Sequence, residues 1–153
     1  MEIRLATLND IDEICPLLNE FFAYNANLQP NYYKIDNECG KYPKSIIEST
    51  EADFLLAFEN GVAVGFIHII QMTTPPFGSI VPHKYAEIIG FMVTSSHRNK
   101  GIGSKLMAAA KHWSTARNLD YVELSVLKNS TEALAFYEQN QFSTVLHTMR
   151  YSL

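Results

Sequence analysis

Residues 93–104 read Val-Thr-Ser-Ser-His-Arg-Asn-Lys-Gly-Ile-Gly-Ser, and this turn is the most informative stretch of the chain. An apolar segment over 85–94 precedes it and predicts a buried strand. The segment that follows, 101–117, places apolar residues on one face at helical spacing and predicts a long amphipathic helix. The stretch therefore predicts a buried strand that turns directly into the N-terminus of a helix.

Such a turn is suited to an anion, because a helix N-terminus exposes unpaired N–H groups and the positive end of the helix dipole. Gly101 and Gly103 lack the side chains that would block a pyrophosphate, and Arg98 and Lys100 add positive charge. A glycine-containing turn with solvated charges would show the same residues. Neither the third glycine of a Rossmann motif nor the Gly-Lys-Ser/Thr ending of a P-loop is present.

The pattern Arg98-x-x-Gly101-x-Gly103 resembles the Arg/Gln-x-x-Gly-x-Gly/Ala signature of the GNAT superfamily of acetyltransferases. In that family the loop binds the pyrophosphate of coenzyme A. The resemblance implies acetyl-CoA as cosubstrate and departs from the family at Asn99, where glycine is common. It implies that the coenzyme is bound by Phe91, Met92, Val93, Arg98, Asn99, Lys100, Gly101, Ile102, Gly103 and Ser104.

A second resemblance to the same family lies in 124–142, where a strand is followed by Asn129 and by a helix with Ala133 and Tyr137 on one face. In the family the Asn contacts the pantetheine arm or its phosphates, and the Tyr hydroxyl can protonate the departing thiolate. By itself Tyr137 could equally be a core residue with its hydroxyl at the surface. Gln141 replaces the usual glycine before Phe142, so a different backbone conformation is expected in that turn.

The remaining segments predict a β-α-α-β-β-β-α-β-α-β order, which is a mixed sheet with helices on its faces. The resemblance implies an α/β (α+β) domain over 1–153, with a mostly antiparallel sheet of six to seven strands, about four helices, and the fourth and fifth strands splayed. The expected strands are 2–6, 53–59, 62–71, 85–94, 121–127 and 142–151. The expected helices are 11–22, 43–49, 101–117 and 131–140, with irregular chain over 24–42 and a loop over 72–83.

The composition excludes some classes of function. The net charge of -4, from 12 basic and 16 acidic residues, argues against nucleic acid as the main partner. No signal peptide and no membrane-spanning stretch is visible, which predicts a soluble cytoplasmic protein. Cys15 and Cys39 form no Cys-x-x-Cys pair, so we expect no disulfide and a small apolar role for Cys15. No histidine pair has metal-ligand spacing, and no metal is predicted.

Acetyl transfer to an amine requires a base, because an alkyl ammonium is almost wholly protonated at neutral pH. Glu87 is the preferred candidate, since it lies in an apolar strand where partial burial would raise its pKa. Strand alternation would place it on the face of Ile89, Phe91 and Val93. A strand-end carboxylate that faces solvent is the equal alternative. Gly90 suggests a bulge, beside which backbone N–H groups near 92–93 would bind the thioester oxygen.

The sequence says less about the acceptor substrate than about the coenzyme. Tyr24, Tyr32 and Tyr33 lie among polar residues and are candidates for an aromatic substrate pocket. The main hypothesis is direct attack on the thioester by a primary amine of a small molecule. The alternatives are a protein or peptide N-acetyltransferase and a catalytically silent acyl-CoA-binding sensor. A homodimer is possible for this family, and the apolar loop 75–77 would suit either a dimer contact or a substrate lid.

Overall fold

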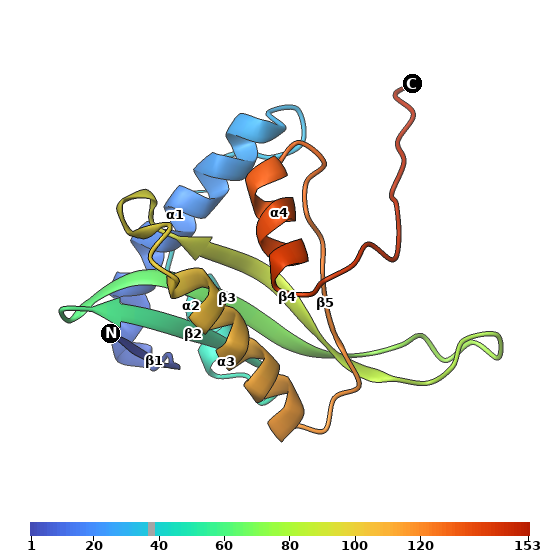
Figure 1. The fold of residues 1–153 in the computed structure, drawn as a ribbon, viewed down its shortest axis with the longest axis horizontal. Helices are drawn as coiled ribbons and strands as arrows, with labels where there is room; N and C mark the ends of the chain where they lie inside the picture. Colours follow the sequence, from blue (N-terminus) through green and yellow to red (C-terminus); the bar gives the residue numbers. More distant parts are fainter. Residues whose placement is uncertain (37–38) are drawn as a thin grey trace.

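The computed structural model describes residues 1–36 and 39–153, in which five strands form one sheet in the order β1-β2-β3-β4-β5 (Figure 1). The neighbours from β1 to β4 are antiparallel, and β5 runs parallel to β4. A mixed, mostly antiparallel sheet is thereby confirmed. The expectation of six to seven strands is wrong for the described residues. The strands are β1 (Glu2–Leu5), β2 (Ala52–Glu59), β3 (Val62–Thr73), β4 (Lys84–Val93) and β5 (Val122–Leu124).

Over the described ranges four α-helices accompany the sheet, as expected: α1 (Ile11–Leu28), α2 (Lys41–Ile47), α3 (Ile102–Ala116) and α4 (Thr131–Gln139). Helix α1 continues beyond the apolar pattern, so Tyr24 is helical and does not lie in irregular chain. Contacts across the fold support this last part of α1, because the Tyr24 hydroxyl meets Ser130 and the Leu28 carbonyl accepts from Asn129. Tertiary contacts of this kind override local propensity. None of the helices in the described ranges is long and apolar enough to cross a membrane.

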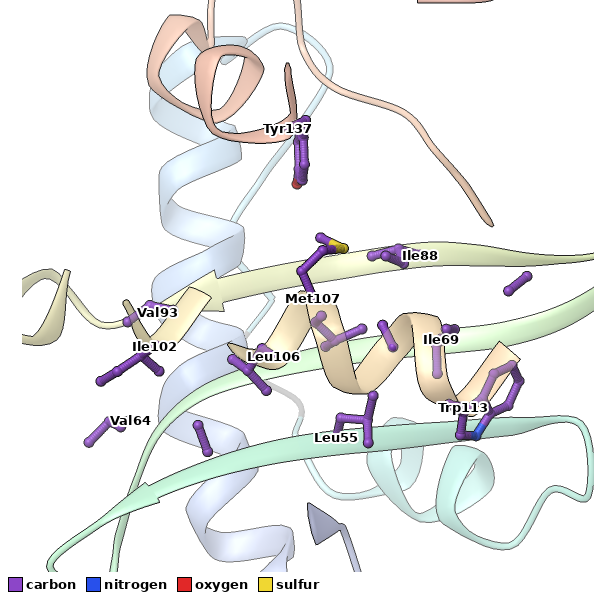
Figure 2. Close-up of a cluster of buried hydrophobic side chains, with 14 residues drawn as sticks. Leu55, Val64, Ile69, Ile88, Val93, Ile102, Leu106, Met107, Trp113 and Tyr137 are labelled. Atoms are coloured by element: carbon purple, nitrogen blue, oxygen red, sulfur yellow. The ribbon is translucent and has the colours of Figure 1, made fainter. Parts of the chain in front are cut away.

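Each face of the sheet carries its own apolar core. Helix α3 covers one face, which we call the α3 face, and Figure 2 shows Leu106, Met107 and Trp113 packing over the strands there. Helices α1 and α2 cover the opposite face, which we call the α1 face, where Phe54, Leu56 and Phe66 are buried. Alternate residues of β2 and β3 thus enter different cores, as strand geometry requires.

A bulge in β4 changes which face each of its residues occupies. The register pairs His68 with Gly90 and Ile69 with Ile88, and so leaves Ile89 without a partner in β3. Ala86 and Ile88 belong to the α3-face core, so Glu87 points to the α1 face. Beyond the bulge, Phe91 and Val93 also lie on the α3 face. The bulge suggested by Gly90 is confirmed, and the expectation that Glu87 shares a face with Phe91 and Val93 is wrong because of it.

The fourth and fifth strands are splayed, as expected. Strand β5 pairs with β4 through Ala86, Glu87 and Ile88 alone, although β4 continues to Val93. The β5 edge of β4 is therefore left without a strand over 89–93, within the described residues. This wedge between β4 and β5 is bordered by the start of α3 and by α4 (Figure 1).

The two cysteines form a disulfide, which overturns the expectation of two reduced thiols. Cys15 of α1 is bonded to Cys39, just before α2, with Cα atoms 5.5 Å apart. Cys39 thus lies beside the first half of α1, and a spacing of 24 residues in the sequence does not reveal this proximity. Closing a loop of that length stabilises a folded chain by about 3.5 kcal/mol in the chain-entropy model.

The expected last strand is not formed. Residues 142–151 have no regular secondary structure, and the strand expected over 121–127 is reduced to Val122–Leu124. A strand exists only where another strand pairs with its backbone. Nothing in the described part of the chain lies beside either segment to extend the sheet beyond β5.

Helix α4 ends in the conformation that glycine would favour, although the residue there is Gln141. Its φ is 70°, the Phe142 N–H donates to the Tyr137 carbonyl, and the Gln141 N–H donates to the Glu138 carbonyl. This is a Schellman motif, and it is completed by the contact of Phe142 with Tyr137, whose ring centroids are 5.9 Å apart. The expectation of a different turn is wrong, because the capping bonds hold Gln141 in the left-handed region.

Gln141→Gly is expected to stabilise the protein by about 0.5–1 kcal/mol, because it relieves the left-handed strain at the cost of a more flexible unfolded chain. In a domain of this size the melting temperature should rise by about 1–4 °C, measured by differential scanning calorimetry. Glu138→Gly, inside α4, is the matched control and should lower the melting temperature. A Gln141→Gly protein that melts at or below the wild-type temperature would contradict this account.

Candidate active site

The turn before α3 has the geometry of an anion cradle. Gly101 has a φ of 76° and caps the helix, and the Lys105 N–H is bonded to the Gly101 carbonyl. The amides of Ile102, Gly103 and Ser104 belong to the first turn, where a helix provides no backbone acceptor. A Cβ atom on Gly101 would meet nothing within 4 Å, so the turn is open on that side of Gly101.

The two neighbouring positions in the turn have different roles. Asn99 has a φ of 60°, a conformation that asparagine tolerates better than most residues, so it substitutes for the glycine common in the family. Gly103 faces the protein, since a Cβ atom there would lie 3.1–3.2 Å from the rings of Phe136 and Phe91. The absence of a side chain at Gly103 therefore serves the packing of α3 against these stacked rings.

Arg98 is tied to the end of β4. Its Nε donates to the Val93 carbonyl at 3.0 Å, and its guanidinium lies 3.9 Å from Glu20 of α1. Lys100 is exposed beside it. Arg98 thus fixes the turn to the strand and to α1, while Lys100 leaves its charge free to attract an anion to the cradle.

Residues before α4 connect that helix to α1. The Asn129 amide donates to the Leu28 carbonyl at 2.7 Å, and the hydroxyls of Ser130 and Tyr24 are 2.6 Å apart. Ala133 packs against the α3-face core. The side-chain nitrogen of Asn129 therefore satisfies a carbonyl at the C-terminus of α1, a role that the sequence pattern did not indicate.

Tyr137 lies on the inner side of α4 and is 9% exposed. Figure 2 shows its hydroxyl directed away from α4, towards β4 and Met107. Burial, and then the nearby Tyr24, raises the pKa of Tyr137 to about 12. The phenol is therefore protonated at neutral pH and is available as a hydrogen-bond donor.

Glu87 lies in an acidic and aromatic patch on the α1 face at the β5 edge of the sheet. The register places Glu123 of β5 directly beside it, and the rings of Tyr85 and Tyr121 stack 4.9 Å apart. Burial, and then the charges of Glu87 and Glu123, raises the pKa of Tyr85. We call Tyr85, Glu87, Tyr121 and Glu123 the acceptor patch. Sequence reasoning missed Tyr85, Tyr121 and Glu123, because the β4–β5 pairing brings them together from distant positions.

The three tyrosines expected in a substrate pocket do not share one environment. Tyr24 lies beside Ser130, whereas Tyr32 is 51% exposed and has the Arg150 guanidinium 3.7 Å from its ring centroid. Tyr33 is 42% exposed. No group of three or more His, Cys, Asp or Glu side chains could hold a metal ion among the described residues.

Sequence reasoning also missed a buried polar pair, Tyr42 and His68. The Tyr42 hydroxyl is 2.5 Å from His68 Nδ1, and His68 is 4% exposed and stacked on Phe54. Its Nε2 atom is buried and has no hydrogen-bond partner among the residues that the structure describes. Burial lowers the pKa of His68 to about 4 and raises that of Tyr42 to about 12, so both groups are neutral at neutral pH.

Comparisons with known proteins agree on one family. The model of the acetyltransferase (GNAT) family matches residues 11–142. The N-acetyltransferase YhfO of Bacillus subtilis is 28% identical over 156 residues, which cover 100% of this chain and 97% of that protein. A mutant of the BH1408 protein from Bacillus halodurans superposes with a TM-score of 0.94 at 20% identity, covering 100% and 99% of the two chains. The aminoglycoside N-acetyltransferase AAC(6')-Iy in complex with CoA has a TM-score of 0.76 at 15% identity, covering 99% and 98%.

The neutral state of His68 predicts a loss of stability in mild acid. The unfolded chain protonates His68 below about pH 6.5, whereas the folded protein resists protonation down to about pH 4. The free energy of unfolding should thus be insensitive to this group above pH 6.5 and fall by about 2–3 kcal/mol as the pH approaches 4. Urea unfolding of wild type and His68→Phe at several pH values measures the difference.

The titration of Asp10 does not affect the comparison of wild type with His68→Phe. Arg4 holds the pKa of the Asp10 carboxyl well below its usual range, so its contribution is lost only below about pH 4 and is common to both proteins. The exposed His112→Gln variant is the control and should keep the wild-type loss. Equal losses in wild type and His68→Phe between pH 6.5 and 4 would show that His68 is not the titrating group.

Proposed function

The chain belongs to the acetyltransferase (GNAT) family and is an acetyl-CoA-dependent acyltransferase, and from this premise we propose that it acetylates a primary amine of a small cationic molecule. The proposal takes residues 1–153 as a single acetyltransferase domain. A protein or peptide acceptor and a catalytically silent acyl-CoA-binding sensor are the alternatives. The observation that carries the proposal is the juxtaposition of an open anion cradle with an acidic and aromatic patch across the β4–β5 wedge.

The cradle fits the pyrophosphate of coenzyme A. The first-turn amides of α3, the exposed Lys100 and the open space in front of Gly101 are the features that a doubly charged anion requires. When bound, acetyl-CoA supplies an acetyl group activated as a thioester. The complex of AAC(6')-Iy with CoA supports this assignment, because that protein has a similar fold. We propose that 91–93 and 98–104 hold the coenzyme, together with Asn129 and Ala133 on the opposite side of the wedge.

Glu87 is the proposed base. It lies two residues before the bulge at Ile89, on the short stretch where β4 and β5 are paired, and therefore at the closed end of the wedge. The adjacent Glu123 favours a cationic partner, because two carboxylates side by side on one sheet face repel each other until a positive charge neutralises them. Glu87 would accept the ammonium proton and leave a neutral amine to attack.

Tyr137 is proposed to stabilise the leaving thiolate by donating a hydrogen bond. With a pKa of about 12 it is a weaker acid than a thiol, whose pKa is near 8.5. Complete proton transfer from the phenol to the sulfur is therefore uphill. A charge-assisted hydrogen bond from Tyr137 fits this acidity better than full protonation of the thiolate.

The acceptor patch supports a small amine with a second positive charge. Stacked Tyr85 and Tyr121 present aromatic surface for cation–π contacts, and Glu123 would pair with the additional charge. Tyr24 lies near Tyr137 and belongs to the proposed site, whereas Tyr32 and Tyr33 are proposed to line its outer part. Spermidine, lysine, kanamycin and a peptide with a free N-terminal alanine form a screening panel that separates small polycations from peptide acceptors.

Ser104→Glu tests the cradle without harming the helix. Glutamate in the first turn of α3 favours the helix dipole, but its charge lies where the phosphates are proposed to bind. In wild type, acetyl-CoA at about 100 times its dissociation constant should stabilise by about 2.7 kcal/mol, seen as a shift in melting temperature. Ser104→Glu should melt at or above the wild-type temperature without coenzyme and lose the shift, and Ser104→Ala should keep it. A full melting-temperature shift with acetyl-CoA in Ser104→Glu would show that the coenzyme phosphates do not bind at the N-terminus of α3.

Glu87→Gln should lower kcat for the best amine of the panel by about 10²–10⁴, as expected for loss of a general base, while the acetyl-CoA shift is retained. Release of the coenzyme thiol provides the assay. Glu123→Gln is the matched control, since it removes the neighbouring carboxylate, and should raise KM for polycations more than it lowers kcat. Equal kcat losses in Glu87→Gln and Glu123→Gln would indicate that Glu87 contributes to substrate binding alone. A melting-temperature shift with acetyl-CoA but no turnover on any amine would favour the catalytically silent sensor.

A further inference from the structure

The Cys15–Cys39 disulfide restrains a segment that has little packing of its own. Residues 30–36, which follow α1, form neither helix nor strand, and all of them are exposed. Even the large side chains of this segment stay in water, since Tyr32 is 51% exposed and Ile35 is 54% exposed. A segment with so little buried surface opens locally at a small cost in free energy unless another bond restrains it.

The helices on either side of this segment are held without the disulfide. Leu17 and Leu18 of α1 are buried in the α1-face core, and Pro43 of α2 is buried as well. The hydrogen bond between Tyr42 and His68 fixes the first turn of α2 to β3. Cleavage of the disulfide would therefore leave both helices in place and release the chain between them.

The disulfide can be reached by a small thiol in solution. Cys15 and Cys39 are both half-buried, so part of each residue faces solvent. Beside Cys39 lies a cavity of about 10 Å³, which is lined in part by Leu18 and Phe22. Two thiol sulfur atoms need more space than two bonded ones, because they approach no closer than van der Waals contact. The cavity gives the Cys39 thiol this space without displacing the closely packed core.

The restrained segment belongs to the acceptor side of the proposed site. Its residues Tyr32 and Tyr33 are the ones proposed to line the outer part of that site. The coenzyme side is held by other contacts, since Arg98 bonds the cradle turn to the Val93 carbonyl of β4. Release of the segment would thus affect the acceptor and leave the cradle unchanged.

We propose that the Cys15–Cys39 bond is a reversible redox site whose reduction releases residues 30–36. The thiolate of a low-molecular-weight thiol, such as glutathione, attacks one sulfur of the bond and displaces the other as a thiolate. A second reductant thiolate then attacks the mixed disulfide. One reductant disulfide is formed, and Cys15 and Cys39 take up the two protons that the reductant thiols released. Oxidised glutathione reverses both steps.

Control of acceptor binding is the consequence, and this consequence rests on the proposed function. In the reduced protein the acceptor binds only while Tyr32 and Tyr33 are in position, so its apparent affinity falls with the fraction of molecules in that state. A competent fraction of about one tenth to one third corresponds to a rise in KM of about 3–10-fold. The kcat and the acetyl-CoA melting shift should not change, because neither Glu87 nor the cradle lies in the released segment.

Digestion with chymotrypsin tests the release without reference to activity. Native protein treated with millimolar reduced glutathione should show two thiols that can be alkylated. Cleavage after Tyr32 and Tyr33 should become about tenfold faster or more, because proteolysis follows the population of the open segment. Phe77, which is 64% exposed in the loop 74–83, is the internal control, and cleavage after it should keep its rate. The variant Cys15→Ser/Cys39→Ser should be cleaved like the reduced protein, with or without glutathione.

Steady-state kinetics test the consequence for the acceptor. After glutathione has been removed by gel filtration, oxidised wild type, reduced wild type and Cys15→Ser/Cys39→Ser are compared on the best amine of the panel by the loss of thioester absorbance. Reduced wild type and the double variant should share the raised KM. Oxidised glutathione should restore the original KM in wild type and have no effect on the double variant. Circular dichroism and the acetyl-CoA melting shift show whether each protein is folded.

Three results would overturn the proposal: a disulfide that millimolar glutathione leaves intact in the native protein, cleavage that accelerates equally after Tyr33 and after Phe77, or an unchanged KM in reduced wild type. The second result would show that the disulfide stabilises the whole domain and not this segment in particular. If no amine of the panel is acetylated, the proposed function fails, and the glutathione and chymotrypsin experiments still decide whether the bond is a redox site.

Discussion

Strands β4 and β5 pair over Ala86–Ile88, and the bulge at Ile89 follows immediately. This short parallel contact determines the rest of the active region. This pairing joins β5 to β4 at one end of the wedge. Beyond the bulge, β4 remains paired with β3 and is no longer paired with β5. The β4 backbone beyond Ile88 keeps an edge without a strand, and unpaired backbone in a sheet needs another partner. A pantetheine-like chain with amide groups has the chemistry to provide one.

The open end of the wedge is held by contacts between helices. Tyr24 and Leu28 of α1 are bonded to Ser130 and Asn129 before α4, and Arg98 links the cradle turn to Glu20 of α1. Helix α1 thus contacts both sides of the wedge. The disulfide from Cys15 to Cys39 adds the connection that follows α1 to the same unit. These links keep the wedge at a fixed width without a strand to fill it, which is the preorganisation that a catalytic site needs.

Much of this could be predicted from the sequence, and the misses have physical reasons. Features that are local in sequence, such as the turn at 98–103 and the strands 53–59 and 62–71 on either side of Asn60-Gly61, depend on neighbouring residues and were predicted with the correct elements. The face of Glu87 was misjudged because one inserted residue reverses the alternation of a strand. The disulfide, the Tyr42–His68 pair and the acceptor patch depend on long-range contacts. The last strand, over 142–151, was predicted from the sequence alone, which does not specify the neighbouring strand that its backbone would need.

The net charge of -4 conceals an uneven distribution of charge along the wedge. Lys100 and the positive end of α3 lie at the cradle, whereas Glu87 and Glu123 lie where β4 and β5 meet. On the proposed function, an anionic cosubstrate and a cationic acceptor would be attracted to different ends of the wedge. Because the two ends differ in the sign of their charge, each end would disfavour the partner that the other end attracts. On the proposed function, this polarity would bring the thioester and the amine together from opposite sides, with Tyr137 between them and little need for the fold to move.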